Sequence, residues 1–282
     1  MVTRTPLSPC AEQVRRNDPD RFLTALFAPA AVREDLFALY ALNDELARAR
    51  EAASEALIGV MRLQWWRDAI EAIHAGTPPR HPVARAVSAG APRRAWPKDA
   101  ILALIDARER DFADGPPENL RALEDHVAAT AGALALLALA TLGIVDTSAR
   151  QAARHAGIAF GLAGLMRSIP DHARARRVLL PANVMAQEGL AAEDIGRERR
   201  PRELAKVVAS VCEVAEAHLL AARRLRNAVP RAAVPALLVG SLAGADLAAL
   251  RRAGYDPFDP ALARGAFGRR LTVTWRAAVG RY

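Results

Sequence analysis

The sequence predicts an all-α fold, and three observations support that prediction. Alanine and leucine dominate a chain in which only 5% of residues are aromatic, a composition that favours helices. Apolar residues recur at intervals of three and four, as in "VREDLFALYALNDEL", while no stretch shows the strict alternation of a half-buried strand. The 282 residues, 52% of them apolar, contain no linker long enough to divide them. We therefore expect a single-domain bundle of about ten helices over residues 1–282.

The N-terminal third is expected to form helices that begin and end at proline, glycine and capping residues. Asp18 or Asp20 is a candidate cap for a short helix that begins at Pro19. A later helix is expected to stop at Gly76 and Pro78. The next stretch, "TPPRHPVARAVSAGAPRRAWPKDA", is expected to be a proline-rich connection that contains a short helix. The helices expected here span residues 8–17, 19–27, 30–53 and 54–76.

One apolar stretch in the rest of the chain has two interpretations. Val127–Val145 contains nineteen residues and no charge, which is long enough to cross a membrane. Because it consists of Ala, Gly and Thr with a few Leu, we favour a helix buried inside the bundle, and a membrane span is the alternative. The other expected helices span residues 97–113, 117–143, 147–168, 181–188, 201–228, 231–252 and 264–279.

The net charge and the cysteine content limit which binding partners and which cellular compartment are expected. The net charge is +8, which suits anionic partners such as diphosphates or acidic lipid surfaces. Nucleic-acid binding is not expected, because the chain has neither zinc-finger spacing nor an RNA-binding aromatic motif. Cys10 and Cys212 lie far apart and fit no metal or redox spacing, so we expect free thiols in a reducing compartment. The N-terminus lacks the apolar stretch of a secretory signal, so a cytoplasmic location is expected.

Two segments indicate a family. The stretch "ALYALNDELARARE" contains Tyr40, and "LAGLMRSIPDHARARRVLLP" contains Arg177 and Pro181. Together they resemble the two acidic motifs of the squalene/phytoene synthase family, whose enzymes join two isoprenoid diphosphates on an all-α, isoprenoid synthase-like fold. In that family the first motif begins seven residues after the tyrosine of "ALYA". The second motif precedes an "RxYLP" segment. The resemblance covers about residues 8–282.

The chemistry of that family depends on paired acids. Two carboxylates at positions i and i+4 lie on one face of a helix. Two such helices hold Mg²⁺ between them, and the metal binds the substrate diphosphate and assists its departure. Mg²⁺ requires oxygen ligands, so the carboxylates are needed for this mechanism.

The expected acids are mostly absent from this sequence. Ala47 stands at the first position of the first motif, and Glu51 at the second. Ser168 and His172 stand at the two positions of the second motif, with Asp171 just before the latter. Only one of the four metal-holding positions is therefore acidic.

Neighbouring residues leave some alternatives open. Asp44 lies one turn before the first motif and could replace its acid only through a register shift, so we interpret it as part of a solvated helix face. Pro170 is expected to end the helix that carries the second motif. No residue is assigned a catalytic or metal-binding role. The candidate site consists of degenerate motif positions and their neighbours: Tyr40, Ala47, Arg48, Glu51, Arg167, Ser168, Asp171, His172 and Arg177.

The small residues of the central helices also allow two interpretations. The helices expected at 127–143 and 147–167 are rich in alanine and glycine. They could line an apolar cavity that holds an isoprenoid or another lipid-like ligand, with arginines at its mouth. Alternatively, the helices pack against each other and fill that space, or the arginines pair with Glu51 and Asp171.

The departures from the motif match one branch of the family. "IGVMRLQWWRDAI" and "LMRSIPDHARARRVLLPANVMAQEGL" are similar to segments of mitochondrial NADH dehydrogenase (complex I) assembly factor 6 and its bacterial relatives. The resemblance implies a non-catalytic protein without a cofactor that works with complex I subunits or assembly intermediates, in peripheral contact with the inner membrane. The alternative is a divergent, Mg²⁺-dependent prenyltransferase of the squalene/phytoene synthase type.

Overall fold

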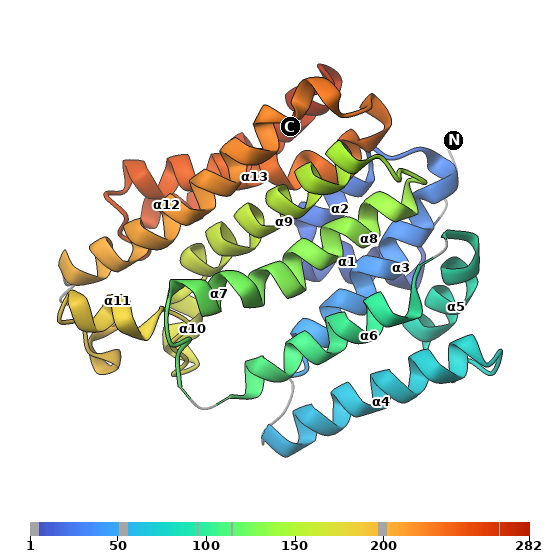
Figure 1. The fold of residues 1–282 in the computed structure, drawn as a ribbon, viewed down its shortest axis with the longest axis horizontal. Helices are drawn as coiled ribbons and strands as arrows, with labels where there is room; N and C mark the ends of the chain where they lie inside the picture. The colour runs from blue at the N-terminus through green and yellow to red at the C-terminus, as the bar shows by residue number, and fades with distance from the viewer. Residues whose placement is uncertain (1–5, 51–55, 95, 114, 197–201, 265) are drawn as a thin grey trace. The chain divides into compact units, whose positions relative to one another are not determined.

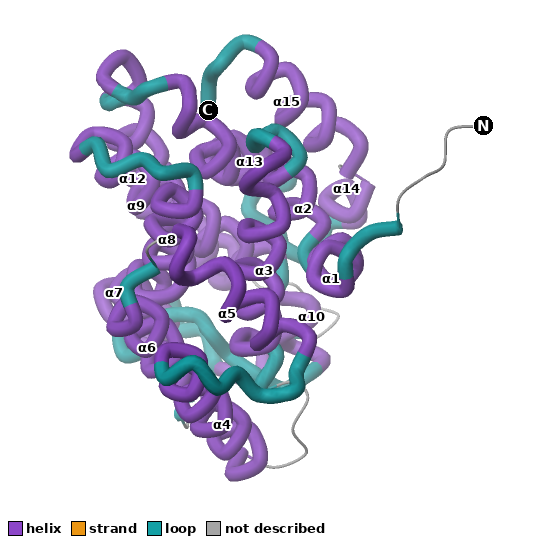
Figure 2. Tube along the Cα trace, turned by 90° about the vertical axis from the view of Figure 1, so that its right-hand side faces the viewer, coloured by secondary structure: helices purple, strands orange, loops and turns teal. Residues whose placement is uncertain are grey.

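The computed structural model describes residues 6–50, 56–94, 96–113, 115–196, 202–264 and 266–282, with the side chains of 263–270 left aside (Figure 1). Within these ranges every regular element is helical and none is a strand (Figure 2). The predicted all-α fold is confirmed. The chain forms two compact units, one of Met1–Ala113 with Leu136–Val145 and the other of Asp114–Ala135 with Asp146–Tyr282. That residues 1–282 act as a single domain stays a prediction.

Helix α3 forms the centre of the first unit. It runs from Ala30 to Ala47, and α1 and α5 pack against it. Its apolar side chains are almost completely buried, which explains why they recur around the whole helix rather than along one stripe. The other helices of this unit are α1 (Pro9–Asn17), α2 (Pro19–Ala25), α4 (Ala56–His74), α5 (Pro82–Arg94) and α6 (Lys98–Ala107).

Local capping chemistry sets the ends of the first helices. Ser8 accepts a hydrogen bond from the backbone N–H of Ala11 at 3.1 Å and begins α1. Asp18 accepts one from the backbone N–H of Arg21 at 3.0 Å and begins α2, so the first of the two predicted caps is the one used. The connection after α4 contains a longer helix than expected, since α5 has 13 residues.

Helix α9 forms the centre of the second unit. It runs from Thr147 to Arg167, and α12 and α13 lie along it (Figures 1 and 2). Alanine and glycine on α9 let these neighbours approach closely. The other helices of this unit are α7 (Leu120–Val127), α10 (Ile169–Arg174), α11 (Ala182–Gln187), α12 (Arg202–Arg224), α13 (Val234–Arg252), α14 (Pro260–Arg264) and α15 (Ala266–Ala278). Helix α8 (Ala133–Thr141) begins in this unit and continues into the first from Leu136.

The apolar stretch Val127–Val145 does not form one helix of that length. A π-helical turn at Ala128–Gly132 joins α7 to α8, and the helix ends at Thr141. Gly143 then takes a positive φ of 75° and Val145 is 85% exposed. Two helical stretches, Leu120–Thr141 and Arg231–Arg252, have the length and composition of membrane spans, but 56% and 78% of their most apolar windows are buried within the protein. Such burial is typical of core helices.

Candidate functional site

The first motif lies at the C-terminal end of α3, in the first unit. Tyr40 is buried on this helix, and the guanidinium carbon of Arg21 lies 6.0 Å from the centre of its ring. Burial raises the pKa of Tyr40 to about 12. Its hydroxyl therefore stays protonated near neutral pH, and the side chain serves as part of the core.

The motif positions themselves fall where α3 ends. Ala47 is the last residue of α3, and Arg48 follows as an exposed residue in a turn. The guanidinium carbon of Arg50 lies 5.9 Å from the centre of the Phe112 ring. Glu51 lies outside the described residues. The predicted helix over residues 30–53 is therefore shorter than expected, because the chain leaves the helix at the motif.

Asp44 occupies a different environment from the one predicted. The expectation of a solvated helix face is wrong, because Asp44 is only 8% exposed. Its Oδ2 accepts hydrogen bonds from Gln13 Nε2 at 2.8 Å and from Asn17 Nδ2 at 2.7 Å, both on α1. Neighbouring Glu45 accepts hydrogen bonds from Gln13 and from Arg62, each at 2.9 Å. Asp44 thus fastens α1 to α3.

The second motif lies in the second unit, where α9 gives way to α10. Helix α9 ends at Arg167, and Ser168 stands between it and α10. Pro170 occupies the first turn of α10, a position that proline favours because its missing N–H has no partner there. The predicted interruption of the helix is therefore present, but it falls at Ser168, before the proline, and Pro170 belongs to the next helix. Of the two positions of the second motif, Ser168 therefore lies at the junction of the helices and His172 within α10, and the backbone N–H of His172 donates to the carbonyl of Ser168 at 3.0 Å.

Asp171 and His172 of α10 each interact with an arginine a few residues later in the chain. Asp171 is exposed and forms an ion pair with Arg174 one turn later. The backbone N–H of Arg177 donates a hydrogen bond to the carbonyl of His172 at 2.8 Å. His172 and Arg177 both line a cavity of only 10 Å³, which is at the lower limit for a single water molecule. This cavity cannot hold an isoprenoid or a diphosphate.

Arg167 points to a carboxylate that sequence reasoning did not associate with it. Its Nη1 lies 3.5 Å from Oδ1 of Asp246, which is on α13 and only 3% exposed. The arginine was expected either at a cavity mouth or paired with Glu51 or Asp171. The contact with Asp246 shows a third arrangement. Its sequence signal is weak, because Asp246 is a lone acid within an apolar helix.

The described carboxylates do not fit a magnesium cluster. Asp44 accepts from two amides, and Asp171 pairs with Arg174. Among the described residues, no three His, Cys, Asp or Glu side chains come together in a way that would hold a metal ion. A Mg²⁺ cluster needs several oxygen ligands directed at a common point. No reaction step can therefore be assigned to a metal from the arrangement of these residues.

Small residues on α9 bring helix backbones together. A Cβ added to Gly157 would lie 2.6 Å from the carbonyl oxygen of Ala131, 2.8 Å from Cβ of Ala135 and 3.0 Å from Cα of Gly132. Contacts this short leave no room for a side chain. At this level of the second unit, the alanines and glycines serve close packing, as in the second of the two interpretations given above.

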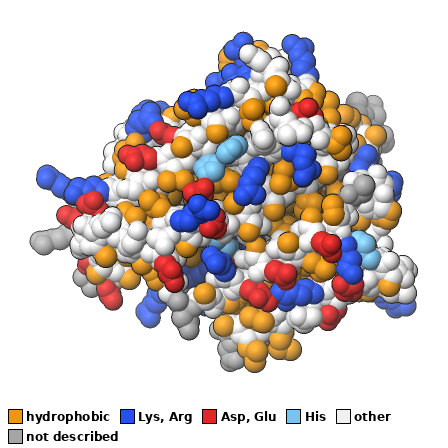
Figure 3. All heavy atoms as spheres, viewed as in Figure 1, with side chains coloured by type: hydrophobic (Ala, Val, Ile, Leu, Met, Phe, Trp, Pro, Cys, Tyr) orange, Lys and Arg blue, Asp and Glu red, His pale blue; other side chains and the backbone are white. Residues whose placement is uncertain are grey.

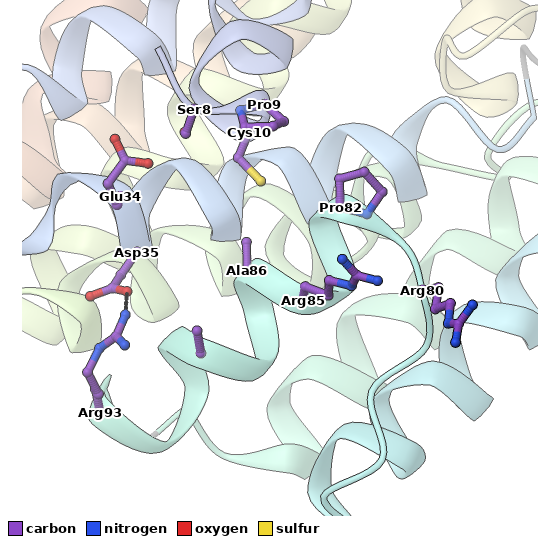
Figure 4. Close-up of a pocket in the computed structure, with 11 residues that line it drawn as sticks. Ser8, Pro9, Cys10, Glu34, Asp35, Arg80, Pro82, Arg85, Ala86 and Arg93 are labelled. Carbon is purple, nitrogen blue, oxygen red and sulfur yellow. Dashed lines mark hydrogen bonds and ion pairs between the residues drawn. The ribbon is translucent and has the colours of Figure 1, made fainter. Parts of the chain in front are cut away.

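The first unit contains a pocket that the motifs did not indicate. It has a volume of 520 Å³ and lies between the start of α1, α3 and α5 (Figure 4). Cys10 points into it, with Arg80 and Arg85 on the α5 side and Asp35 bound to Arg93 (Figure 4). Burial, followed by the charges of nearby glutamates, raises the pKa of Cys10 to about 11. The thiol is therefore protonated and weakly nucleophilic. Both cysteines are free, as predicted.

A pair of histidines is brought together by three helices of the second unit. His155 on α9 and His218 on α12 face each other with their Nδ1 atoms 2.8 Å apart. His218 Nε2 lies 3.1 Å from Oε1 of Glu124 on α7. Both rings are satisfied when neutral, because His218 can donate to Glu124 and accept from His155. Sequence analysis missed this cluster because its members lie 63 and 94 residues apart.

The histidine pair predicts a pH-dependent stability. Burial lowers the pKa of His155, and the positive charges of His218 and Arg154 lower it further. Below about pH 6.5 the unfolded chain takes up a proton more readily than the folded protein, so stability falls as the pH drops. Between about pH 7 and about pH 5, we expect the denaturant concentration at the unfolding midpoint to decrease. His155→Gln should make that decrease smaller. His74→Gln, an exposed control, should leave it unchanged, and an equal effect of both substitutions would contradict this assignment.

The comparison with protein families decides the identity of the fold. The model of the squalene/phytoene synthase family matches residues 14–277. The chain belongs to this family. A solved relative confirms the fold of its members, since a squalene synthase from Alicyclobacillus acidocaldarius superposes with a TM-score of 0.77. That likeness covers 88% of this chain and 94% of the other, at 24% sequence identity.

Curated relatives within the family fall into two groups. NADH dehydrogenase (ubiquinone) complex I, assembly factor 6 of Homo sapiens is 34% identical over 253 residues, covering 90% of this chain and 76% of that protein. Presqualene diphosphate synthase of Rhodopseudomonas palustris is 27% identical over 212 residues, covering 74% of each chain. The similarity is thus higher, and extends over more of the chain, for the assembly factor than for the synthase.

Proposed function

We propose that this chain is a non-catalytic member of the squalene/phytoene synthase family that aids the assembly of respiratory complex I (NADH:quinone oxidoreductase). The observation that best supports the proposal is the arrangement of the residues at the second motif. Ser168 stands at the N-cap position of α10, His172 lies one turn into it, neither supplies a carboxylate, and Asp171 between them is bound to Arg174. A fold that supports diphosphate chemistry here keeps an acid at only one of the four motif positions that this chemistry uses. The greater similarity to assembly factor 6 supports the same conclusion.

The proposal extends to partners and location. The partners would be complex I subunits or their assembly intermediates, met by a cytoplasmic protein in peripheral contact with the inner membrane. Nucleic acid is not among them. In support of this, the face drawn in Figure 3 intersperses arginines with acidic and apolar side chains instead of gathering them into one basic patch.

Deleting the gene tests this function directly. We expect less assembled NADH:quinone oxidoreductase and an unchanged content of isoprenoid products. Native gels stained for NADH dehydrogenase activity would measure the first, and mass spectrometry of extracted lipids the second. A normal amount of complex I together with a missing squalene- or phytoene-type lipid would instead support the prenyltransferase alternative.

A purified-protein assay tests the absence of catalysis separately. We expect no Mg²⁺-dependent release of diphosphate from farnesyl or geranylgeranyl diphosphate, because Ala47 and Ser168 supply no carboxylate and His172 is a poor ligand for a hard cation. Restoring aspartate at all three positions should increase Mg²⁺ affinity but give little turnover, since α9 still ends at Arg167. Steady release of diphosphate by the unmodified protein, abolished by EDTA, would overturn the non-catalytic assignment.

A further inference from the structure

A basic pocket lies along α13 in the second unit. It has a volume of 620 Å³, within the range of small-molecule sites, and α9, α12 and α15 contribute to its walls. One aspartate and four arginines line it, an excess of three positive charges: Asp246, Arg167, Arg223, Arg252 and Arg276. Arg167 lies against Asp246 at 3.5 Å, and no other carboxylate lines the pocket. The remaining positive charge comes from the other three arginines.

Two polar atoms in the pocket wall lack a hydrogen-bond partner within the described protein. They are Nε of Arg223 and Oγ of Ser241, both buried from solvent. Ser241 is only 3% exposed, so bulk water does not reach its hydroxyl. A buried polar group without a partner typically costs about 1–3 kcal/mol. These two atoms therefore leave hydrogen-bonding capacity unused in the wall of the pocket.

The guanidinium of Arg223 lies close against the backbone of α13. A Cβ added to Gly244 would lie 2.7 Å from its Nη2, so glycine at this position lets the arginine approach without moving aside. Burial lowers the pKa of Arg223, and the positive charges of Arg276 and Arg226 lower it further. Bringing these like charges together is unfavourable unless an anion offsets them. Phosphate suits the site, because guanidinium groups bind its oxygens in a bidentate geometry.

An apolar stripe on α15 lies beside the pocket. Leu271 and Trp275 lie four residues apart on one face of the helix, and Val279 follows just past its end, where its N–H donates to the carbonyl of Trp275 at 3.1 Å. They are 56%, 58% and 39% exposed. The guanidinium carbon of Arg276, which lines the pocket, lies 5.3 Å from the centre of the Trp275 ring. A helix with exposed Leu and Trp on one face and arginine beside them is typical of segments that lie in a membrane interface.

We propose that this part of the second unit binds the phosphate headgroup of an anionic phospholipid at a membrane surface. Arg223, Arg252 and Arg276 surround the phosphate, and the α15 stripe enters the adjoining acyl-chain region. The charge of the pocket and the apolar stripe beside it together match a phospholipid, which carries a phosphate and acyl chains in one molecule. The inference rests on the peripheral membrane contact proposed above and names the group that would make it, and its residues lie outside the motif positions apart from Arg167.

Vesicle sedimentation of the full chain tests the proposal. Vesicles of phosphatidylcholine alone are compared with vesicles that also contain phosphatidylglycerol, and we expect strong binding only to the latter. Arg223→Gln should lower the vesicle affinity by about tenfold, equivalent to about 1.4 kcal/mol. Arg224→Gln is the matched control, because Arg224 is the exposed neighbour on the same helix and does not line the pocket. Arg223→Lys tests the need for a guanidinium, and circular dichroism checks that each variant is folded.

A second pair of variants tests the apolar stripe. Trp275→Ser should reduce vesicle binding and abolish the blue shift of tryptophan fluorescence that accompanies it, whereas Trp65→Ser, at an exposed site of the first unit, should leave both intact. Equal losses for Arg223→Gln and Arg224→Gln would overturn the pocket as the binding site. Binding to neither vesicle type, or complete displacement from vesicles by millimolar inorganic phosphate, would overturn the membrane phospholipid as its occupant.

Discussion

Replacing Gly157 with valine should lower the free energy of unfolding by about 3 kcal/mol, because overpacking costs most where a backbone cannot move aside. The first added carbon alone would meet the carbonyl oxygen of Ala131 at 2.6 Å. Relief requires α9 to move away from the π-helical turn at Ala128–Gly132. That movement would also disturb α12 and α13, which pack on α9. Denaturant unfolding followed by circular dichroism would measure the loss.

A second glycine of the same helix provides a matched control. No atom lies within 4 Å of a Cβ added to Gly164, and its backbone is helical. Gly164→Ala should therefore raise the free energy of unfolding by about 0.5–1 kcal/mol, since alanine loses less conformational freedom in a helix. If Gly157→Val were as stable as the unmodified protein, the close approach of α9 to Ala131 would be wrong.

The contrast between these two glycines shows where sequence analysis reached its limit. The apolar periodicity around Leu36 and Tyr40 predicted helices because it depends on neighbours three and four residues away. Whether a run of small residues lines a cavity or allows close contact depends on what faces it. The nearest residue that faces Gly157 is Ala131, and the sequence alone does not predict that these two residues lie opposite each other.

The candidate site shows the same division. That Ala47 and Ser168 stand at positions where the family has acids stays a prediction, made from the register that the motifs fix along the chain. The contact of Arg167 with Asp246 could not be predicted, since it depends on how α9 packs against α13. The expectation that Asp44 faces solvent is wrong for the same reason, because its partners lie on another helix. From the sequence, an acid at the polar edge of a helix is expected to face solvent. In the structure a second helix packs against it and brings Gln13 and Asn17 to Asp44.

The loss of motif carboxylates that we propose need not loosen the fold. In the second unit, close backbone packing at Gly157 and the ion pair of Arg167 with Asp246 hold α9 independently of any metal. In the first unit, the hydrogen bonds to Asp44 hold the end of α3. A scaffold stabilised in this way can exchange a metal-dependent reaction for binding, as we propose here.

Asp35→Ala should be the most damaging charge removal in the first unit. The side chain of Asp35 is only 5% exposed and binds two arginines at the end of α5. Its Oδ1 accepts from Arg93 Nη2 and its Oδ2 from Arg94 Nε, each at 2.6 Å. Gly90 makes room for this carboxylate, since a Cβ there would lie 3.2 Å from Oδ1. Substitution leaves both arginines without this carboxylate and weakens the attachment of α5 to α3, although Arg94 Nη2 still donates to the carbonyl of Ala31 at 2.7 Å.

The expected loss is about 2–3 kcal/mol in the free energy of unfolding, below the roughly 3–5 kcal/mol of a fully buried pair because Arg93 is 58% exposed to water. Glu71→Ala is the control within the same unit. It breaks the pair of Glu71 with Lys98, whose side chains are 54% and 37% exposed, and should cost at most about 1 kcal/mol. Asp35→Asn should fall between the two, since one amide oxygen can still accept from a guanidinium. Equal midpoints for Asp35→Ala and Glu71→Ala in urea unfolding would show that burial adds nothing to the Asp35 contacts, contrary to the packing of α5 on α3.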